Sequence, residues 1–295
     1  METWIAFTLL AAFMQAIRTA GQKQLSAQLS SLATAGVRYI FALPFAWLYL
    51  WWALNHYQVA LPALNPTFLQ YAIIASFAQL IGTACLVIAF QYRNFAVATS
   101  LAKTEAIQVA VIGALLFAAP LSGYGWLSVI LGVVGVILLS KVKFNLKDIL
   151  TNPGAGYGLA SGLGLAITTL LIRESNLALG SHPMVNAAVT LVFLISAQSL
   201  LAGLYLLMRD ASQFRKMVIN WRLALFVGIT SLLGSIGWFT AVSYQTAAYV
   251  KALGQVEFFI TLVLTYRLFK EKTTPAEILG MLLIVVSVVV LLLLA

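Results

Sequence analysis

Apolar residues run along this chain in long stretches that short polar breaks separate. A helix that crosses a membrane needs about 20 mostly apolar residues, and ten stretches approach that length. We expect transmembrane helices at 3–20, 33–53, 68–91, 95–118, 123–140, 155–173, 185–208, 220–244, 247–269 and 276–294. The alternating segments of a membrane β-barrel are absent from the pattern, and no break is long enough to hold a soluble domain. The chain is therefore predicted to be an all-α polytopic membrane protein.

The composition supports a lipid environment. Hydrophobic residues make up 62% and charged residues 8% of the 295 residues, whereas soluble proteins carry about 25% charged residues. Such a chain cannot cover a water-facing surface with polar groups. We interpret the net charge of +9 as a topology signal, because a nucleic-acid-binding protein would need a basic face on a soluble domain.

Basic residues gather in every second connection between the expected helices. Connections after even-numbered helices hold Arg173, whereas connections after odd-numbered helices hold Lys23, Arg93, Lys141, Lys143, Lys147, Arg209, Arg215, Lys216, Arg222, Lys270 and Lys272. By the positive-inside rule, the odd-numbered connections face the cytoplasm. We therefore predict a protein of a bacterial-type cytoplasmic (inner) membrane with both termini on the outer face.

The second half of the chain repeats the first at an offset of 152 residues, without a gap from the third helix of each half to its end. The distinctive matches are Gly82 with Gly234, Tyr92 with Tyr244 and Glu105 with Glu257. We expect two repeats, 1–150 and 151–295, within one transmembrane unit. Because each repeat has an odd number of helices, the second enters the membrane in the opposite orientation. This inverted-repeat architecture is typical of secondary transporters, whose site lies near the membrane midplane between the repeats.

The end of each half resembles the EamA-type family of the drug/metabolite transporter superfamily. In ALGQVEFFITLVLTYRLFKEKTTPAEILGMLLIVVSVVVLL, Glu271 and Gly280 stand where the family has an acidic turn and a glycine in its last helix. The first half is similar over LAKTEAIQVAVIGALLF and GYGWLSVILGVVGVILL, although AAPLSG replaces the acidic turn, and Arg38 matches an arginine often seen in the second helix of such repeats. The resemblance implies ten transmembrane helices as two inverted five-helix repeats around a central cavity, and it names no substrate.

Two of the expected helices carry ionisable residues near their centres, which costs roughly 2.5–3.5 kcal/mol for each charge. The fourth helix holds Lys103 and Glu105, and the ninth holds Lys251, Gln255 and Glu257. Two positions span about 200° around a helix, so Lys103 and Glu105 should point to nearly opposite faces. The repeat offset places Gln255 at the position of Lys103. We therefore expect a site that is symmetric in its acids and asymmetric in its cations.

Two interpretations of these buried groups stay open. In the functional one, some of Glu105, Glu257, Lys103 and Lys251 bind the substrate or a coupling proton, because a desolvated carboxylate can exchange a proton near neutral pH. In the structural one, buried ion pairs fix the helix register, for example Glu105 with Lys251 or Glu257 with Lys103. The same residues could serve both purposes.

Other polar and aromatic side chains are candidates for the substrate path. Arg38 either extends to the cytoplasmic face or acts as a gate or an anion-binding group. Gln15 could line a cavity. Tyr92, Tyr244 and Trp238 could form aromatic walls for a cationic or aromatic substrate, although such residues are more often found in cores and interface belts.

Several residue types exclude other functions. Cys85 is alone, so no disulfide and no cysteine cluster can form within the chain. His56 and His182 fall in expected loops, and no Ser/His/Asp set accompanies them. We expect no catalytic residue, no metal and no cofactor. TNPGAGYGLASGLGLA carries stripes of small residues at every fourth position, which permit close helix contact.

These observations predict a secondary active transporter of a small polar or amphipathic metabolite that works by alternating access. No ATP-binding motif occurs, so a gradient, exchange or downhill flow must drive it. The resemblance favours export of an amino acid or related compound. Alternatives are uptake of a small organic cation such as an amine, a flippase for a lipid-linked substrate, and a membrane assembly subunit without transport. Expected partners are the substrate, the lipid bilayer, and protons or a counter-substrate, with no nucleic acid; the chain should be a monomer or a weak homodimer.

Overall fold

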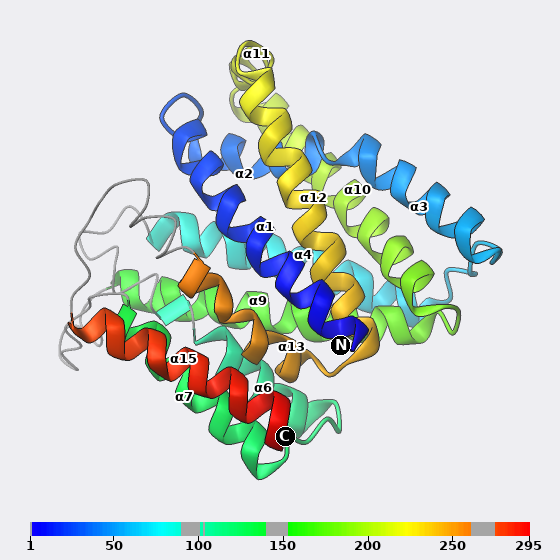
Figure 1. Ribbon diagram of the computed structural model, residues 1–295. Coiled ribbons are helices and arrows are strands. Elements are labelled where there is room, and N and C mark those ends of the chain that lie inside the picture. Colours follow the sequence, from blue (N-terminus) through cyan, green and yellow to red (C-terminus); the bar gives the residue numbers. More distant parts are fainter. Residues whose placement is uncertain (1, 90–100, 103, 140–152, 261–274) are drawn as a thin grey trace. The chain divides into compact units, whose positions relative to one another are not determined.

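The structure, a computed structural model, describes residues 2–89, 101–102, 104–139, 153–260 and 275–295 (Figure 1). Over these residues every regular element is a helix, which confirms the all-α prediction. In chain order the helices are α1 (Thr3–Leu25), α2 (Ser31–Ile40), α3 (Leu43–Tyr57), α4 (Pro66–Ala89), α6 (Glu105–Leu116), α7 (Gly123–Leu139), α9 (Pro153–Ala178), α10 (Pro183–Arg209), α11 (Ser212–Ile219), α12 (Trp221–Tyr244), α13 (Ala247–Gly254) and α15 (Pro275–Leu294).

Six described stretches are long and apolar enough to cross a membrane. They are Thr3–Gln22, Leu32–Tyr57, Pro66–Leu86, Pro153–Ala178, Pro183–Arg209 and Trp221–Tyr244. Shorter apolar helices occupy Glu105–Leu116, Gly123–Leu138 and Ile278–Leu294. All of these coincide with stretches expected from hydropathy, whereas the total of ten crossing helices stays a prediction.

Local side chains fix where several helices begin. Ser30, Asn65 and Ser122 each accept a hydrogen bond from a backbone N–H three residues later, as N-cap residues do. Leu32–Tyr57 is divided into α2 and α3 because Pro44, near the start of α3, has no N–H to offer the carbonyl of Ile40. These caps satisfy helix ends that would otherwise present unpaired groups.

Two residues expected in connections lie inside helices. His56 belongs to the last turn of α3, where its ring stacks on Trp52 at 4.9 Å and meets Tyr57 edge-on at 4.8 Å between centroids. Arg173 belongs to α9, because its guanidinium finds a partner within the fold, the Val242 carbonyl of α12. The loop assignments of these two residues were therefore wrong. Without Arg173, the connections expected on the outer face lose their one basic residue.

The chain divides into two compact units, and each unit combines parts of both sequence halves. Unit 1 comprises Met1–Phe77 and Leu171–Tyr244, and unit 2 comprises Ala78–Leu170 and Gln245–Ala295. The boundaries cut through α4 and α9. The halves 1–150 and 151–295 thus describe repetition along the chain, whereas the units describe proximity in space.

Unit 1 is built on the packing of α1 along α12 and of α2 and α3 along α10 (Figure 1). A Cβ on Gly237 would lie 2.6 Å from the Phe7 carbonyl oxygen, so α1 and α12 can approach this closely only with glycine there. A buried apolar cluster packs the end of α1 and α2 against the end of α10, α11 and the start of α12. Its members are Leu25, Leu29, Ala33, Val37, Leu206, Met217, Ala224 and Val227.

Unit 2 is built on α7 beside α15 and on α6 beside α13 (Figure 1). Within it, α4 and α9 meet at Gly82 and Gly164, where a Cβ on Gly164 would lie 2.8 Å from the Gly82 Cα. Gly164 belongs to one of the small-residue stripes, which therefore serves the close contact expected of it. This packing brings the fourth and ninth expected helices, which carry the buried charges, side by side.

Candidate functional site

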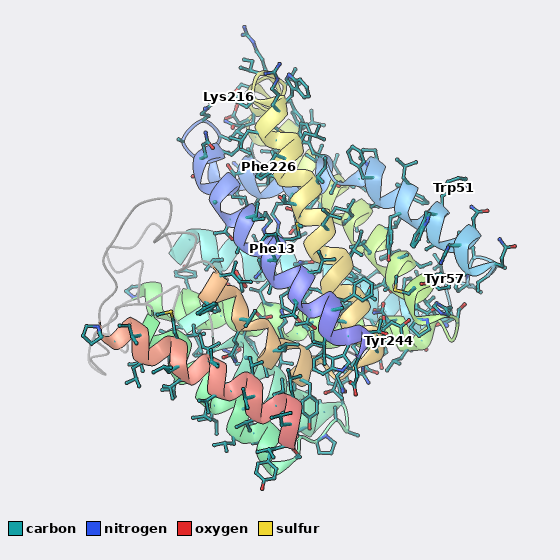
Figure 2. The ribbon with its side chains drawn as sticks, viewed as in Figure 1. Phe13, Trp51, Tyr57, Lys216, Phe226 and Tyr244 are labelled. Atoms are coloured by element: carbon teal, nitrogen blue, oxygen red, sulfur yellow. The ribbon has the colours of Figure 1, made fainter. Side chains whose placement is uncertain are left out.

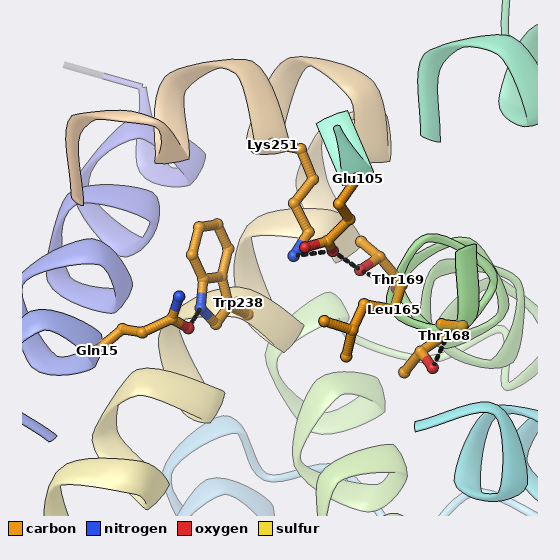
Figure 3. A network of polar contacts seen from close by, with 8 residues as sticks. Gln15, Glu105, Leu165, Thr168, Thr169, Trp238 and Lys251 are labelled. Carbon is orange, nitrogen blue, oxygen red and sulfur yellow. Dashed lines mark hydrogen bonds and ion pairs between the residues drawn. The ribbon is translucent and has the colours of Figure 1, made fainter. Parts of the chain in front are cut away.

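An ion pair joins the two charged helices of unit 2. The Lys251 Nζ of α13 lies 2.7 Å from the Glu105 Oε1 of α6, and both side chains are 18% exposed (Figure 3). The Thr169 hydroxyl of α9 donates to the same carboxylate oxygen at 3.4 Å and to the Leu165 carbonyl at 3.0 Å. Three helices thus meet at one carboxylate. The pair is one of the two that the structural interpretation of the sequence named.

Each charge of the pair also lies at the end of a helix that favours its sign. Glu105 is the first residue of α6, where the helix dipole stabilises an anion. Lys251 lies in the last turn of α13, where the dipole stabilises a cation. The pair therefore receives electrostatic support from the backbone as well as from its own contact.

These helix ends exist because the fourth and ninth expected helices are interrupted rather than continuous. A turn at Thr104 separates the helical residues 101–102 from α6, and a turn at Gln255 separates α13 from helical residues 256–260. Under the repeat offset Gln255 corresponds to position 103, next to Thr104, so both interruptions occur at equivalent places. Discontinuous helices in transporters present such ends to substrates and ions.

Local hydrogen bonds explain the interruptions. The Thr104 N–H donates to the Leu101 carbonyl at 3.1 Å, and the Gln255 N–H donates to the Ala252 carbonyl at 3.3 Å. Each bond spans three residues instead of the four of an α-helix, so the chain tightens locally. The Thr104 hydroxyl also donates to the Leu101 carbonyl at 2.6 Å, which competes with regular helix bonding. No proline lies near either interruption, so the sequence does not predict them.

Gln255 and Glu257 are buried beside the second interruption. Their side chains are 5% and 8% exposed. Neither amide atom of Gln255 has a hydrogen-bond partner among the described residues. Its Oε1 lies against Gly132 of α7, where a Cβ would come within 1.9 Å. Gly132 therefore makes room for a buried amide that no sequence pattern connects with α7.

A second polar contact joins two predicted residues within unit 1. The Trp238 indole N–H of α12 donates to the Gln15 Oε1 of α1 at 3.0 Å, and both side chains are half-buried (Figure 3). From the sequence, both residues were predicted to line a substrate path, but no contact between them was predicted. Their hydrogen bond joins α1 to α12, and a role in a substrate path stays a prediction.

The remaining predicted residues are dispersed. Arg38 lies in the last turn of α2, with its guanidinium carbon 5.4 Å from the centroid of the Tyr39 ring. Its Nε is buried without a hydrogen-bond partner in the described part of the chain. Tyr244 is the last residue of α12 and is 40% exposed. Lys103 and Tyr92 lie outside the described residues.

The sequence missed a polar clamp at the end of α12. Arg173 Nη1 donates to the Val242 carbonyl at 2.8 Å. One turn further along α9, the Asn176 amide donates to the Phe239 carbonyl at 3.0 Å and to the Ser243 hydroxyl at 2.7 Å. The clamp satisfies carbonyl groups near a helix end. Arg173 and Asn176, three residues apart on one helix face, were the signal available in the sequence.

Comparison with known families decides the class of this protein. The family model described as "EamA-like transporter family" matches the chain twice, over residues 2–141 and 152–293. The chain belongs to the EamA-like transporter family. Members of this family are transporters, and the chain is a multi-pass membrane protein built from two repeats that carries small molecules. The resemblance inferred from the ends of the two halves is thereby confirmed.

Comparison with solved structures supports the fold. A structure titled "Crystal structure of protein" matches with a TM-score of 0.76 at 15% identity, and the match covers 100% of this chain and 99% of that chain. At this identity the likeness concerns the fold alone. No curated protein matches the sequence.

Proposed function

We propose that this protein is a secondary active transporter of a small polar or amphipathic metabolite, works by alternating access, and exports an amino acid or related compound. The observation that carries the proposal is the Glu105–Lys251 pair, which is largely shielded from solvent and lies at the ends of two interrupted helices. Two charges within a membrane protein cost free energy, and in a transporter they can bind a charged substrate.

A zwitterion fits this pair because it carries the same two charges. Its ammonium can take the place of Lys251 beside Glu105, while its carboxylate meets the released Lys251. Every charge then keeps a partner during the exchange, and neither side chain is left buried and uncompensated, which would cost several kcal/mol. Without substrate the pair closes on itself, so the empty carrier is also stable.

Glu257 is the candidate for coupling. It corresponds to Glu105 in the second repeat and is 8% exposed. In this proposal Glu257 is the group that binds a coupling proton. A counter-substrate that occupies the pair on the return step would serve the same purpose without a proton.

A small organic cation is the second candidate substrate. Both repeats keep the acid, but at the position that corresponds to Lys103 the second repeat has the uncharged Gln255. An amine could take the place of Lys251 beside Glu105, and Lys251 would then have to find another partner or solvent. In that case, the direction of transport would be uptake.

Transport by purified protein in liposomes tests the proposal. An amino acid, the amine that lacks its carboxylate and the acid that lacks its ammonium are compared in exchange assays. We expect the amino acid to be exchanged and Glu105→Gln to lower its exchange at least tenfold. Glu174→Gln, a half-buried carboxylate of α9 outside the pair, is the matched control and should retain the flux. Equal flux in both variants would refute the role of Glu105, and preference for the amine would favour the second candidate.

A further inference from the structure

The short helix α11 connects two helices that are long and apolar enough to cross a membrane. It follows α10, whose apolar stretch ends at Arg209, and precedes α12, which begins at Trp221. Gln213 and Met217, one turn apart, form its buried face, whereas the other side of the helix is exposed. Substrate transport requires no such surface helix, so this element needs its own explanation.

Hydrogen bonds hold α11 in a fixed position. The Gln213 Oε1 accepts from the Ser30 N–H at 3.1 Å, which ties α11 to the start of α2. The side-chain amide of Gln213 also donates to the Asp210 carboxylate at 2.7 Å, and the backbone N–H of Ser212 donates to the same carboxylate at 3.2 Å. The one acidic residue of the segment is thus engaged in capping the helix. The exposed face therefore has a defined shape and is not a loose loop.

The exposed side of this segment is strongly basic. Arg209, Arg215, Lys216 and Arg222 are all exposed, and Lys216 projects outward from α11 (Figure 2). With Asp210, residues 209–222 carry a net charge of +3. No ion pair involves these four cations within the described ranges of the chain. Their charge is therefore available to a partner of opposite sign.

Exposed apolar side chains accompany the charges. Met208 is 78%, Val218 67%, Ile219 67% and Trp221 51% exposed. In a membrane protein such side chains contact acyl chains, and tryptophan prefers the interface between acyl chains and headgroups. A fixed helix with basic and apolar groups side by side matches the chemistry of an anionic lipid, which offers a negative headgroup above a hydrocarbon chain.

We propose that α11, together with the adjoining ends of α10 and α12, binds the headgroup of an anionic phospholipid. Arg215 and Lys216 contact the phosphate, while Val218, Ile219 and Trp221 lie against the acyl chains. The guanidinium of Arg222, 5.6 Å from the Trp221 ring, supports the aromatic anchor. A neutral phospholipid lacks the net charge that this surface complements. This site is independent of the substrate and of the direction of transport.

Lipid titration of the purified full-length protein in neutral detergent tests the site. Bound lipid is counted by native mass spectrometry with phosphatidylglycerol and, separately, phosphatidylcholine. We expect a preference of about tenfold or more for phosphatidylglycerol, because each basic residue at the surface adds attraction to an anionic lipid. Arg215→Gln/Lys216→Gln should lose most of this preference, and Arg215→Lys/Lys216→Arg, which keeps both charges, should retain it.

Two outcomes would overturn the proposal. One is an unchanged preference for phosphatidylglycerol in the double glutamine variant. The other is an equal loss in Lys270→Gln/Lys272→Gln, since that would show that overall charge, and not α11, attracts the lipid. If the double variant does not fold, Arg215→Gln and Lys216→Gln alone should each lower the preference, and both side chains are exposed enough to leave the core intact.

Discussion

Lys251 and Glu105 show how a membrane protein can keep two charges out of solvent. Each is stabilised by the other at 2.7 Å and by a helix end of suitable sign. Removing one partner takes the 2.7 Å contact away from a charge that is largely shielded from solvent, and breaking a buried ion pair in this way typically costs about 3–5 kcal/mol, whereas losing both partners costs less. Stability and transport therefore depend on the same two residues, and an experiment must separate them.

Gly132 is a residue whose importance only the structure reveals. A Cβ there would overlap the Gln255 Oε1, so Gly132→Ala must displace a buried side chain. We expect a loss of about 1–3 kcal/mol in the free energy of unfolding, as in other overpacked cores. Gln255→Ala in the same chain should restore most of the loss, measured by thermal unfolding in detergent.

Gly203→Ala provides the matched control for this prediction, since a Cβ at Gly203 of α10 meets nothing within 4 Å. It should leave stability unchanged or raise it, because alanine favours helices over glycine. Equal destabilisation at both glycines would contradict the proposed overlap at Gly132.

At the scale of the elements, interruption of two equivalent helices is the feature that distinguishes this fold from a simple bundle. Hydropathy predicted where the helices lie, because about 20 apolar residues in lipid have few alternatives to a helix. It could not predict the turns at Thr104 and Gln255, since no proline marks them; at Thr104 the side-chain hydroxyl competes for a backbone carbonyl.

The sequence also could not predict which side chains pair across helices, because that depends on how the helices pack. The repeat offset connected Glu105 with Glu257, but the partner of Glu105 depended on which helices pack together. Glu105 with Lys251 was therefore one of two example pairs, beside Glu257 with Lys103. Thr169 gave no signal at all, because threonines in helices commonly bond to their own backbone, as Thr169 also does.

The start of α11 carries a pH-dependent prediction. Hydrogen bonds from Ser212 and Gln213, with a smaller contribution from the nearby Lys216 charge, hold the pKa of Asp210 below its ordinary value. A lowered pKa means that this cap is complete above the ordinary aspartate pKa and is lost as pH falls through the lowered one. Hydrogen exchange at the Ser212 backbone amide, which donates to the Asp210 carboxylate, should therefore quicken at acidic pH relative to the intrinsic rate.

Asp210→Asn removes the charge that responds to pH. The variant should show faster exchange at the Ser212 backbone amide at neutral pH and no further acid-dependent loss of protection. Unchanged protection in the variant would contradict the role of Asp210 as the cap of α11.

At the scale of the whole molecule, the family assignment and the double match to one family model account for the two-repeat organisation. Orientation in the membrane follows from charge. With Arg173 inside α9, all connections that carry basic residues follow odd-numbered members of the ten helices expected from hydropathy. A reporter fused after Ala295 should therefore be active only outside the cytoplasm. Activity of a cytoplasmic reporter at the same place would reverse the predicted topology.

Charge reversal of the Glu105–Lys251 pair tests the central claim most directly. Glu105→Lys/Lys251→Glu keeps an ion pair but exchanges its ends, at a modest cost from the two helix dipoles of about 0.3–1 kcal/mol each. Thermal unfolding and amino-acid exchange in liposomes are measured for this variant and for Glu105→Lys and Lys251→Glu alone. We predict that reversal recovers most of the stability lost in the single variants while exchange stays at least tenfold below the original protein. Recovery of exchange together with stability would show that the pair only holds the helices together, and would contradict a substrate-binding role.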